Sequence, residues 1–109
     1  MEADTTLVRW FSDLSRADIP VVGGKNASLG EMTGQLREAG IKVPSGFATT
    51  ADAYWYFVEA NDLKERLSAR LDQLTKDAGN LAQVGRAVRQ MILKADIPDE
   101  LAESILQAY

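Results

Sequence analysis

Two adjacent glycines, at positions 23 and 24, divide the chain into a front section of strand-like residues and a longer section with helical periodicity. Before them, Leu7–Phe11 and Ile19–Val22 are short apolar runs rich in β-branched or aromatic residues, which predicts two short strands. Pro20 has no backbone N–H, so the second strand is expected at a sheet edge or to begin near this residue. After the glycines, the apolar spacing becomes that of an α-helix.

The first helical segment begins at Lys25 and ends at Gly40. Glycine at that position can adopt the left-handed conformation that closes a helix, and Pro44 prevents the helix from restarting. The segment Val43–Thr49 then predicts extended backbone with a short strand. Apolar residues within the helix recur at i, i+3, i+7 and i+10, which predicts one core-facing stripe. The stripe consists of Leu29, Met32, Leu36 and Ala39.

Four more helices are predicted, each from residues suited to a helix start. These starts are Thr49–Thr50, Asn61–Asp62, Asn80 with Gln83 three residues later, and Pro98. The fold class is therefore α+β and mostly helical, with two or three short strands and about five helices. Residues 1–109 are expected to form a single partial domain, because a chain of this length holds one hydrophobic core.

Several apolar groups on these helices have two interpretations. The aromatic run Tyr54–Phe57 fits core or interlobe packing, because adjacent helical residues point in different directions, and stacking on an adenine ring is the alternative. The stripe Leu63, Leu67, Leu71 and Leu74 fits a core face, with a partner-binding surface as the alternative. The hydroxyls of Thr49 and Thr50 fit helix caps, and a contact to nucleotide is the alternative.

Composition excludes several classes of function. Twelve Lys and Arg against sixteen Asp and Glu give a net charge of -4, and the basic residues are scattered, so no nucleic-acid partner is expected. The sequence contains no cysteine and no histidine, which excludes disulfides, the usual zinc ligand sets and histidine-dependent triads. No metal ligand set is predicted.

The chain ends indicate its context. The acidic start Met1–Asp4 is unlike a secretory signal, and no apolar run approaches the roughly eighteen residues that span a bilayer. We therefore expect a cytoplasmic protein without membrane contact. Leu101–Tyr109 still shows helical periodicity where the sequence stops, so we expect the chain to be the N-terminal piece of a larger protein.

The segment with the clearest chemistry is Gly23-Gly24-Lys25 at the mouth of the first long helix. Free N–H groups and the helix dipole favour an anion there, glycine permits close approach of a ligand, and Lys25 adds a full positive charge. A Walker A loop does not fit, because Ile19 and Asn26 stand where it needs glycine and Ser or Thr. Without further information, a glycine turn beside a solvated lysine is the favoured interpretation of the segment, because such turns are common between a strand and a helix.

Two blocks, Gly23-Gly24-Lys25-Asn26-Ala27-Ser28-Leu29-Gly30-Glu31-Met32 and Gly40-Ile41-Lys42-Val43-Pro44-Ser45-Gly46-Phe47-Ala48-Thr49-Thr50, resemble the opening of the ATP-binding domain of phosphoenolpyruvate synthases. Pyruvate phosphate dikinases and rifampicin phosphotransferases share the pattern more loosely. The close resemblance covers about residues 10 to 60, whereas residues 61 to 109 match in helical character and position.

The resemblance implies the N-terminal subdomain of an ATP-grasp fold. The whole enzyme would convert ATP, pyruvate and water to phosphoenolpyruvate, AMP and phosphate, with Mg²⁺ as a cofactor and a phosphohistidine on another domain. Lys25 matches the lysine that contacts the ATP phosphates, and Gly23 and Gly24 would let the loop close over the nucleotide. No catalytic residue is assigned to this chain, and neither activity nor a bound cofactor is expected of it alone.

Two alternatives remain at this point. One is a small helical interaction domain whose glycine turn has no ligand. The other keeps the fold and replaces pyruvate with an antibiotic, as in the rifampicin phosphotransferases, because acceptor choice is made outside this segment.

Overall fold

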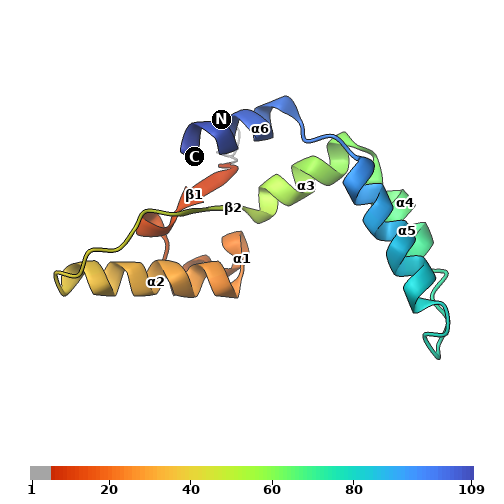
Figure 1. Cartoon of the computed structure of the whole chain (residues 1–109), viewed down its shortest axis with the longest axis horizontal. Helices are drawn as coiled ribbons and strands as arrows, with labels where there is room; N and C mark the ends of the chain where they lie inside the picture. The colour runs from red at the N-terminus through yellow and green to blue at the C-terminus, as the bar shows by residue number, and fades with distance from the viewer. Residues whose placement is uncertain (1–5) are drawn as a thin grey trace. The chain divides into compact units, whose positions relative to one another are not determined.

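The computed structural model describes residues 6–109, and in that range it contains six α-helices, two 3-10 helices and one two-stranded sheet (Figure 1). The mostly helical α+β fold predicted from the sequence is confirmed. The residues form two compact units: one extends up to Trp55 and includes Asp99–Tyr109, and the other is Tyr56–Pro98. The elements are β1 Val8–Trp10, η1 Phe11–Asp13, η2 Arg16–Asp18, α1 Ile19–Val22, α2 Gly24–Glu38, β2 Phe47–Thr49, α3 Ala51–Ala60, α4 Leu63–Leu71, α5 Leu81–Lys94 and α6 Asp99–Ala108.

The sheet pairs β1 with β2 in antiparallel orientation, with Arg9 opposite Ala48. Phe11 N donates to Gly46 O at 2.9 Å and extends the ladder beyond β1. The rings of Trp10 and Phe47 meet edge to face with centroids 5.5 Å apart. Aromatic pairs of this kind stabilise neighbouring strands. The strands predicted in Leu7–Phe11 and in Val43–Thr49 are therefore both present.

The second predicted strand is wrong, because Ile19–Val22 forms the one-turn helix α1. The preceding turn η2 is closed by a capping box: Ser15 Oγ accepts from Ala17 N at 3.2 Å, and Asp18 Oδ2 accepts from Ser15 N at 2.9 Å. Pro20 then lies in the first turn of α1, where its fixed φ and missing N–H suit a helix start. These local features override the strand preference of the branched residues.

The end of α2 agrees with the prediction. Gly40 has a φ of 83°, and its N–H donates to Arg37 O at 3.0 Å. Ile41 N donates to Leu36 O at 2.9 Å. Together these bonds form a Schellman motif, which satisfies the last carbonyls of the helix and requires the left-handed residue that glycine supplies.

The predicted core-facing stripe of α2 is wrong for Met32 and Ala39, which are exposed, whereas Leu29 and Leu36 are half-buried. The buried residues of α2 are Ala27, Gly30 and Thr33, whereas Met32 is 49% exposed. A Cβ on Gly30 would lie 2.9 Å from the carbonyl oxygen of Leu14, so the helix and the Leu14 segment approach too closely for a larger side chain. Small side chains thus form the packed face of α2. The core around it consists of Leu14, Val22, Ala27 and Ala48, with Phe11 and Val21 packed against it.

Thr50 begins α3, as one of the two predicted cap residues. Its Oγ1 accepts from Ala53 N at 3.1 Å and donates to Thr6 O at 2.9 Å, and Thr50 is buried. Both bonds engage the hydroxyl within the protein, which supports the structural interpretation over a nucleotide contact. In α3 itself, Tyr54 and Trp55 are about half exposed, so packing in the core of this chain is wrong for these two rings. The interlobe packing given beside it stays a prediction.

In the second unit, α4 packs against α5. Leu63 is fully buried, but Leu71 is 51% exposed, so the predicted leucine stripe belongs to the core only at its N-terminal end. The predicted side-chain caps at Asp62 and Asn80 are also wrong, because neither side chain bonds to the helix that follows it.

The asparagines of this unit instead hold loops. Asn61 Oδ1 accepts from Asp96 N at 3.1 Å, and Asn80 Oδ1 accepts from Thr75 N at 3.1 Å. In the loop before α5, the hydroxyl of Thr75 and the N–H of Gly79 donate to Asp77, and these hydrogen bonds hold the pKa of the Asp77 carboxyl below its ordinary value.

No helix within residues 6–109 combines the length and the apolar character that crossing a bilayer requires.

Candidate anion-binding site

The three residues predicted to bind phosphate lie at the junction between α1 and α2. Gly23 separates the two helices with φ 85° and ψ 164°, and Gly24 and Lys25 open α2. All three are exposed. The site is therefore a helix–glycine–helix corner, where the sequence predicted a strand followed by a helix.

The first turn of α2 presents three backbone N–H groups that have no partner within the helix. The earliest helical bond runs from Ala27 N to Gly23 O at 3.0 Å, so the amides of Gly24, Lys25 and Asn26 precede the hydrogen-bond ladder. Gly23, at the N-cap, has no side chain that could cap them. A Cβ built on Gly23 or Gly24 would meet no heavy atom within 4 Å, so the space beside the Cα atoms of these two residues is open.

The local charge favours an anion. The N-terminus of a helix carries roughly half a positive charge, and the first turn of α2 contains no acidic residue. Lys25 adds an exposed ammonium group. Within residues 6–109 the single salt bridge joins Arg9 to Asp18 at 4.0 Å, so no carboxylate of the described residues neutralises Lys25.

Replacing Gly23 or Gly24 with alanine should have different effects on the stability of the chain. We expect Gly23→Ala to destabilise the chain by about 1–3 kcal/mol, because its backbone conformation belongs to a region that only glycine adopts readily. Gly24→Ala adds the same methyl group to a helical residue and should leave stability nearly unchanged. Urea unfolding followed by tryptophan fluorescence measures both, and equal midpoints for the two variants would contradict the assigned strain.

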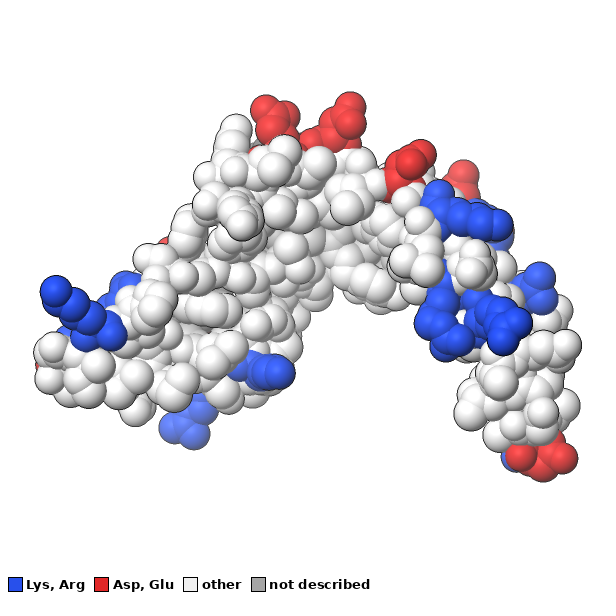
Figure 2. Space-filling view, viewed as in Figure 1, with Lys and Arg blue, Asp and Glu red and all other residues white. Residues whose placement is uncertain are grey.

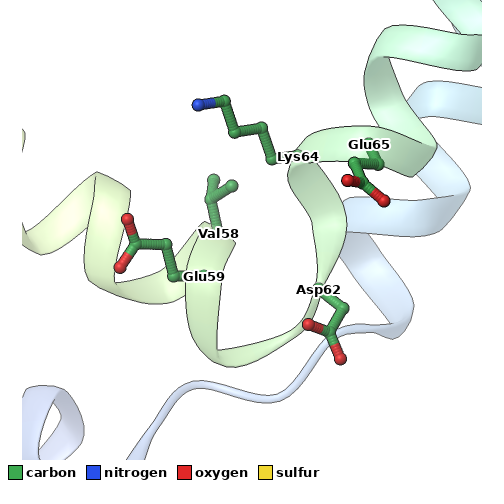
Figure 3. A pocket seen from close by; sticks show the side chains of 5 residues that line it. All are labelled: Val58, Glu59, Asp62, Lys64 and Glu65. Carbon is green, nitrogen blue, oxygen red and sulfur yellow. The ribbon is translucent and has the colours of Figure 1, made fainter.

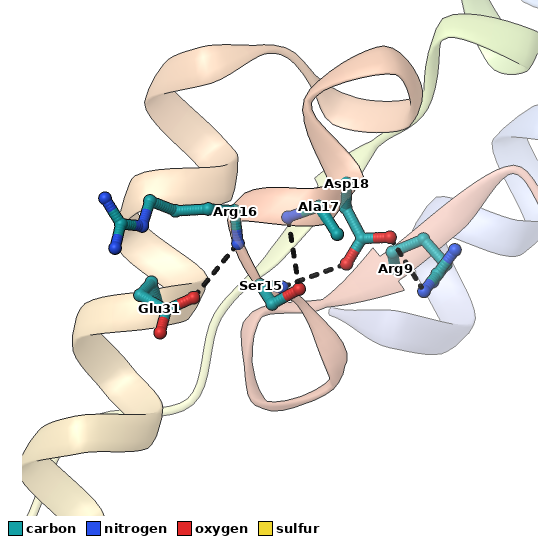
Figure 4. Close-up of polar contacts among 6 residues, drawn as sticks. All are labelled: Arg9, Ser15, Arg16, Ala17, Asp18 and Glu31. Carbon is teal, nitrogen blue, oxygen red and sulfur yellow. Dashed lines mark hydrogen bonds and ion pairs between the residues drawn. The ribbon is translucent and has the colours of Figure 1, made fainter.

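A set of polar contacts holds α2 against the turn before α1 (Figure 4). Glu31 Oε1 accepts from the backbone N–H of Arg16 at 3.0 Å, which places a carboxylate at the start of η2. Asp18 closes the same turn through Ser15 and also pairs with Arg9. The α1–α2 corner is thus anchored at its base by contacts that leave Lys25 unengaged.

Asn26 is the residue of this corner that the sequence interpretation missed. Its side-chain Nδ2 donates to the carbonyl oxygen of Val22 at 3.0 Å, across the junction. Asparagine side chains often hydrogen-bond to a backbone group four residues earlier in the chain. The position of Asn26 four residues after Val22 was therefore the available signal for this contact.

A hollow of about 380 Å³ lies at the α3–α4 corner of the other unit (Figure 3). Glu59, Asp62 and Glu65 bring three carboxylates to its lining, and Lys64 brings one ammonium group. This balance repels a polyphosphate, so the hollow is not a candidate for nucleotide phosphates.

Lysine and arginine side chains gather over α4 and α5 (Figure 2). Arg86 and Arg89 are exposed there and form no salt bridge with a described residue, which agrees with a solvated polar face. Within the part of the chain that the structure describes, no three acidic side chains lie close enough to hold a metal ion.

Residues 19–109 match the family model of the pyruvate phosphate dikinase AMP/ATP-binding domain. The chain belongs to this family. The match begins at Ile19, so the AMP/ATP-binding domain model includes the whole α1–α2 corner with Gly23, Gly24 and Lys25.

Curated relatives extend the similarity to most of the chain. The phosphoenolpyruvate synthase of Neisseria meningitidis is 50% identical over 103 residues, covering 94% of this chain and 13% of the relative. That of Escherichia coli is 42% identical over 104 residues with the same coverage. That of Pyrococcus furiosus is 36% identical over 135 residues, covering 94% of this chain and 16% of the relative. The chain thus spans about an eighth of the length of the first two proteins.

Proposed function

We propose that the α1–α2 corner binds the phosphate groups of ATP. The amides of Gly24, Lys25 and Asn26 would donate to phosphate oxygens, and the Lys25 ammonium would neutralise part of their charge. The observation that carries this proposal is the combination of three open amides with an unpaired lysine beside two exposed glycines. The chain also belongs to an AMP/ATP-binding domain family. This membership favours a phosphate site over the alternative, a glycine turn without a ligand.

We further propose that residues 1–109 form the N-terminal part of an ATP-grasp domain in a cytoplasmic phosphoenolpyruvate synthase. The names of the relatives support this assignment. The whole protein would use ATP, pyruvate and water to make phosphoenolpyruvate, AMP and phosphate. Because this chain contains no histidine, a phosphohistidine intermediate would have to form on the remaining domains of the same polypeptide.

The contribution of this chain is electrostatic and positional. A cation and fixed amide dipoles stabilise the charge on phosphoryl oxygens without proton transfer, so no acid or base is needed at this corner. Mg²⁺ usually accompanies ATP in such reactions. The described carboxylates do not gather into a metal site, so we assign no Mg²⁺ ligand to this chain.

Titration of the ¹⁵N-labelled chain with Mg-ATP tests the phosphate proposal by NMR. We expect weak binding, with the largest shifts at the amides of Gly24, Lys25 and Asn26 and smaller effects in Lys25→Ala. The amides of the loop at residues 75–80 serve as an internal control and should not respond. Shifts confined to another region would contradict the proposal. If the isolated chain shows no shifts, the activity of Lys25→Ala in a whole enzyme that contains this chain decides.

A further inference from the structure

The side chain of Asn26 makes a hydrogen bond across the α1–α2 corner. The corner contains a one-turn helix, α1, whose end would otherwise be weakly held: Gly23 N donates to Ile19 O at 2.8 Å, and Val22 lies at the C-terminus, where carbonyls lack helical partners. Asn26 Nδ2 satisfies the Val22 carbonyl at 3.0 Å. Gly23 lies between these two residues, and glycine has more backbone freedom than any other residue.

The geometry points to Asn26 as a positioning residue for phosphate binding, and this inference rests on the function proposed above. The side chain spans the glycine and ties the end of α1 to the first turn of α2. It thereby limits the angles at which the amides of Gly24 and Lys25 face a ligand. Preorganised donors bind better than mobile ones because less conformational freedom is lost on binding.

Asn26 suits this role because its side chain is partly buried and turned back toward Val22. Its backbone N–H belongs to the open first turn, whereas its side-chain amide points into the corner. The side chain of Asn26 therefore acts on the site through its contact with α1 and does not itself face the ligand. Ser28, two positions later in the same helix, is exposed and provides a matched polar control.

The test compares Asn26→Ala, Asn26→Asp and Ser28→Ala in the full 109-residue chain. Loss of the side-chain donor should accelerate hydrogen exchange of the Gly23 amide about three- to tenfold in both Asn26 variants, because one hydrogen bond that closes the corner is gone. Ser28→Ala should exchange like the unchanged chain. The aspartate variant keeps the size of the side chain but cannot donate to the Val22 carbonyl.

Binding of Mg-ATP, followed at the Gly24 and Lys25 amides, gives the second measurement. We expect Asn26→Ala to bind about three- to tenfold more weakly than the unchanged chain. If Asn26→Ala bound Mg-ATP as tightly as the unchanged chain, and its Gly23 amide exchanged at the same rate, the positioning role would be wrong. The proposed function would be unaffected by that result. If the unchanged chain shows no response to ATP, the comparison is repeated in a whole enzyme that contains this chain. No ATP binding there would contradict the proposed function, and Gly23 exchange alone would then decide whether Asn26 holds the corner.

Discussion

Lys25→Ala should lower kcat/KM for ATP by about two orders of magnitude in an active enzyme that contains this chain, because a positioned charge on the phosphate oxygens is lost. A chimera provides such an enzyme, with this chain in place of the matching segment of the Neisseria meningitidis phosphoenolpyruvate synthase. The 50% identity over 103 residues makes that exchange structurally conservative. Lys25 is exposed and makes no described salt bridge, so its removal should leave folding intact.

Lys42→Ala is the matched control, because Lys42 is also an exposed lysine but lies in the loop after α2. We expect this control to retain nearly full activity. Lys25→Arg separates charge from shape, since arginine keeps the positive charge but presents a planar fork in place of a compact ammonium. Unchanged kcat/KM in Lys25→Ala, with the unmodified chimera active, would remove Lys25 from the site.

Gly30→Ala should destabilise the chain by about 3 kcal/mol, near the upper end of the usual cost of overpacking a core. The added methyl group would lie 2.9 Å from the carbonyl oxygen and 3.0 Å from the carbonyl carbon of Leu14. These are backbone atoms, so rotation of a side chain cannot relieve the collision. Either α2 or the Leu14 segment must move, and both belong to the core of this unit.

Gly34→Ala makes the same change one helical turn later and should change the free energy of unfolding in the opposite direction. Its new Cβ would meet nothing within 4 Å, so the better helix propensity of alanine should stabilise the chain by about 0.5–1 kcal/mol. Urea unfolding followed by circular dichroism measures both variants under one condition. A Gly30 variant as stable as the Gly34 variant would contradict the close packing of α2 on Leu14.

Features set by local chemistry were predictable from the sequence. Gly40 ends α2 because a left-handed residue is needed there, and Thr50 begins α3 because its hydroxyl accepts from Ala53 N. Packing was harder to predict. The core face of α2 was assigned to its largest apolar residues, but the short distance to Leu14 selects Ala27 and Gly30 instead.

Two other predictions were wrong because neighbouring residues outweighed the preference of the segment itself. Ile19–Val22 has strand-like composition, yet the capping box before it and Pro20 within it favour a helical turn. Asn80 precedes a helix, but its side chain bonds to Thr75 and Gln73 in the preceding loop. Propensity alone does not rank such competing hydrogen bonds.

The candidate site was only partly predictable. Gly23, Gly24 and Lys25 were identified from residue type and from the resemblance, and the structure places them at an open helix start. Their role in binding ATP stays a prediction. The contact from Asn26 to Val22 was missed because it depends on α1 being a helix that ends beside it.

The attachment of α2 to Leu14 and Arg16 has a mechanical consequence. Gly30 packs directly against the Leu14 backbone with no side chain between them, and the Glu31 carboxylate accepts a hydrogen bond from the Arg16 backbone. Sliding or tilting this helix would break both contacts, the packing against Leu14 and the hydrogen bond between Glu31 and Arg16. Movement of α2 relative to the rest of this unit is therefore costly, and if the α1–α2 corner binds phosphate as proposed, its amides would keep their place when a ligand arrives.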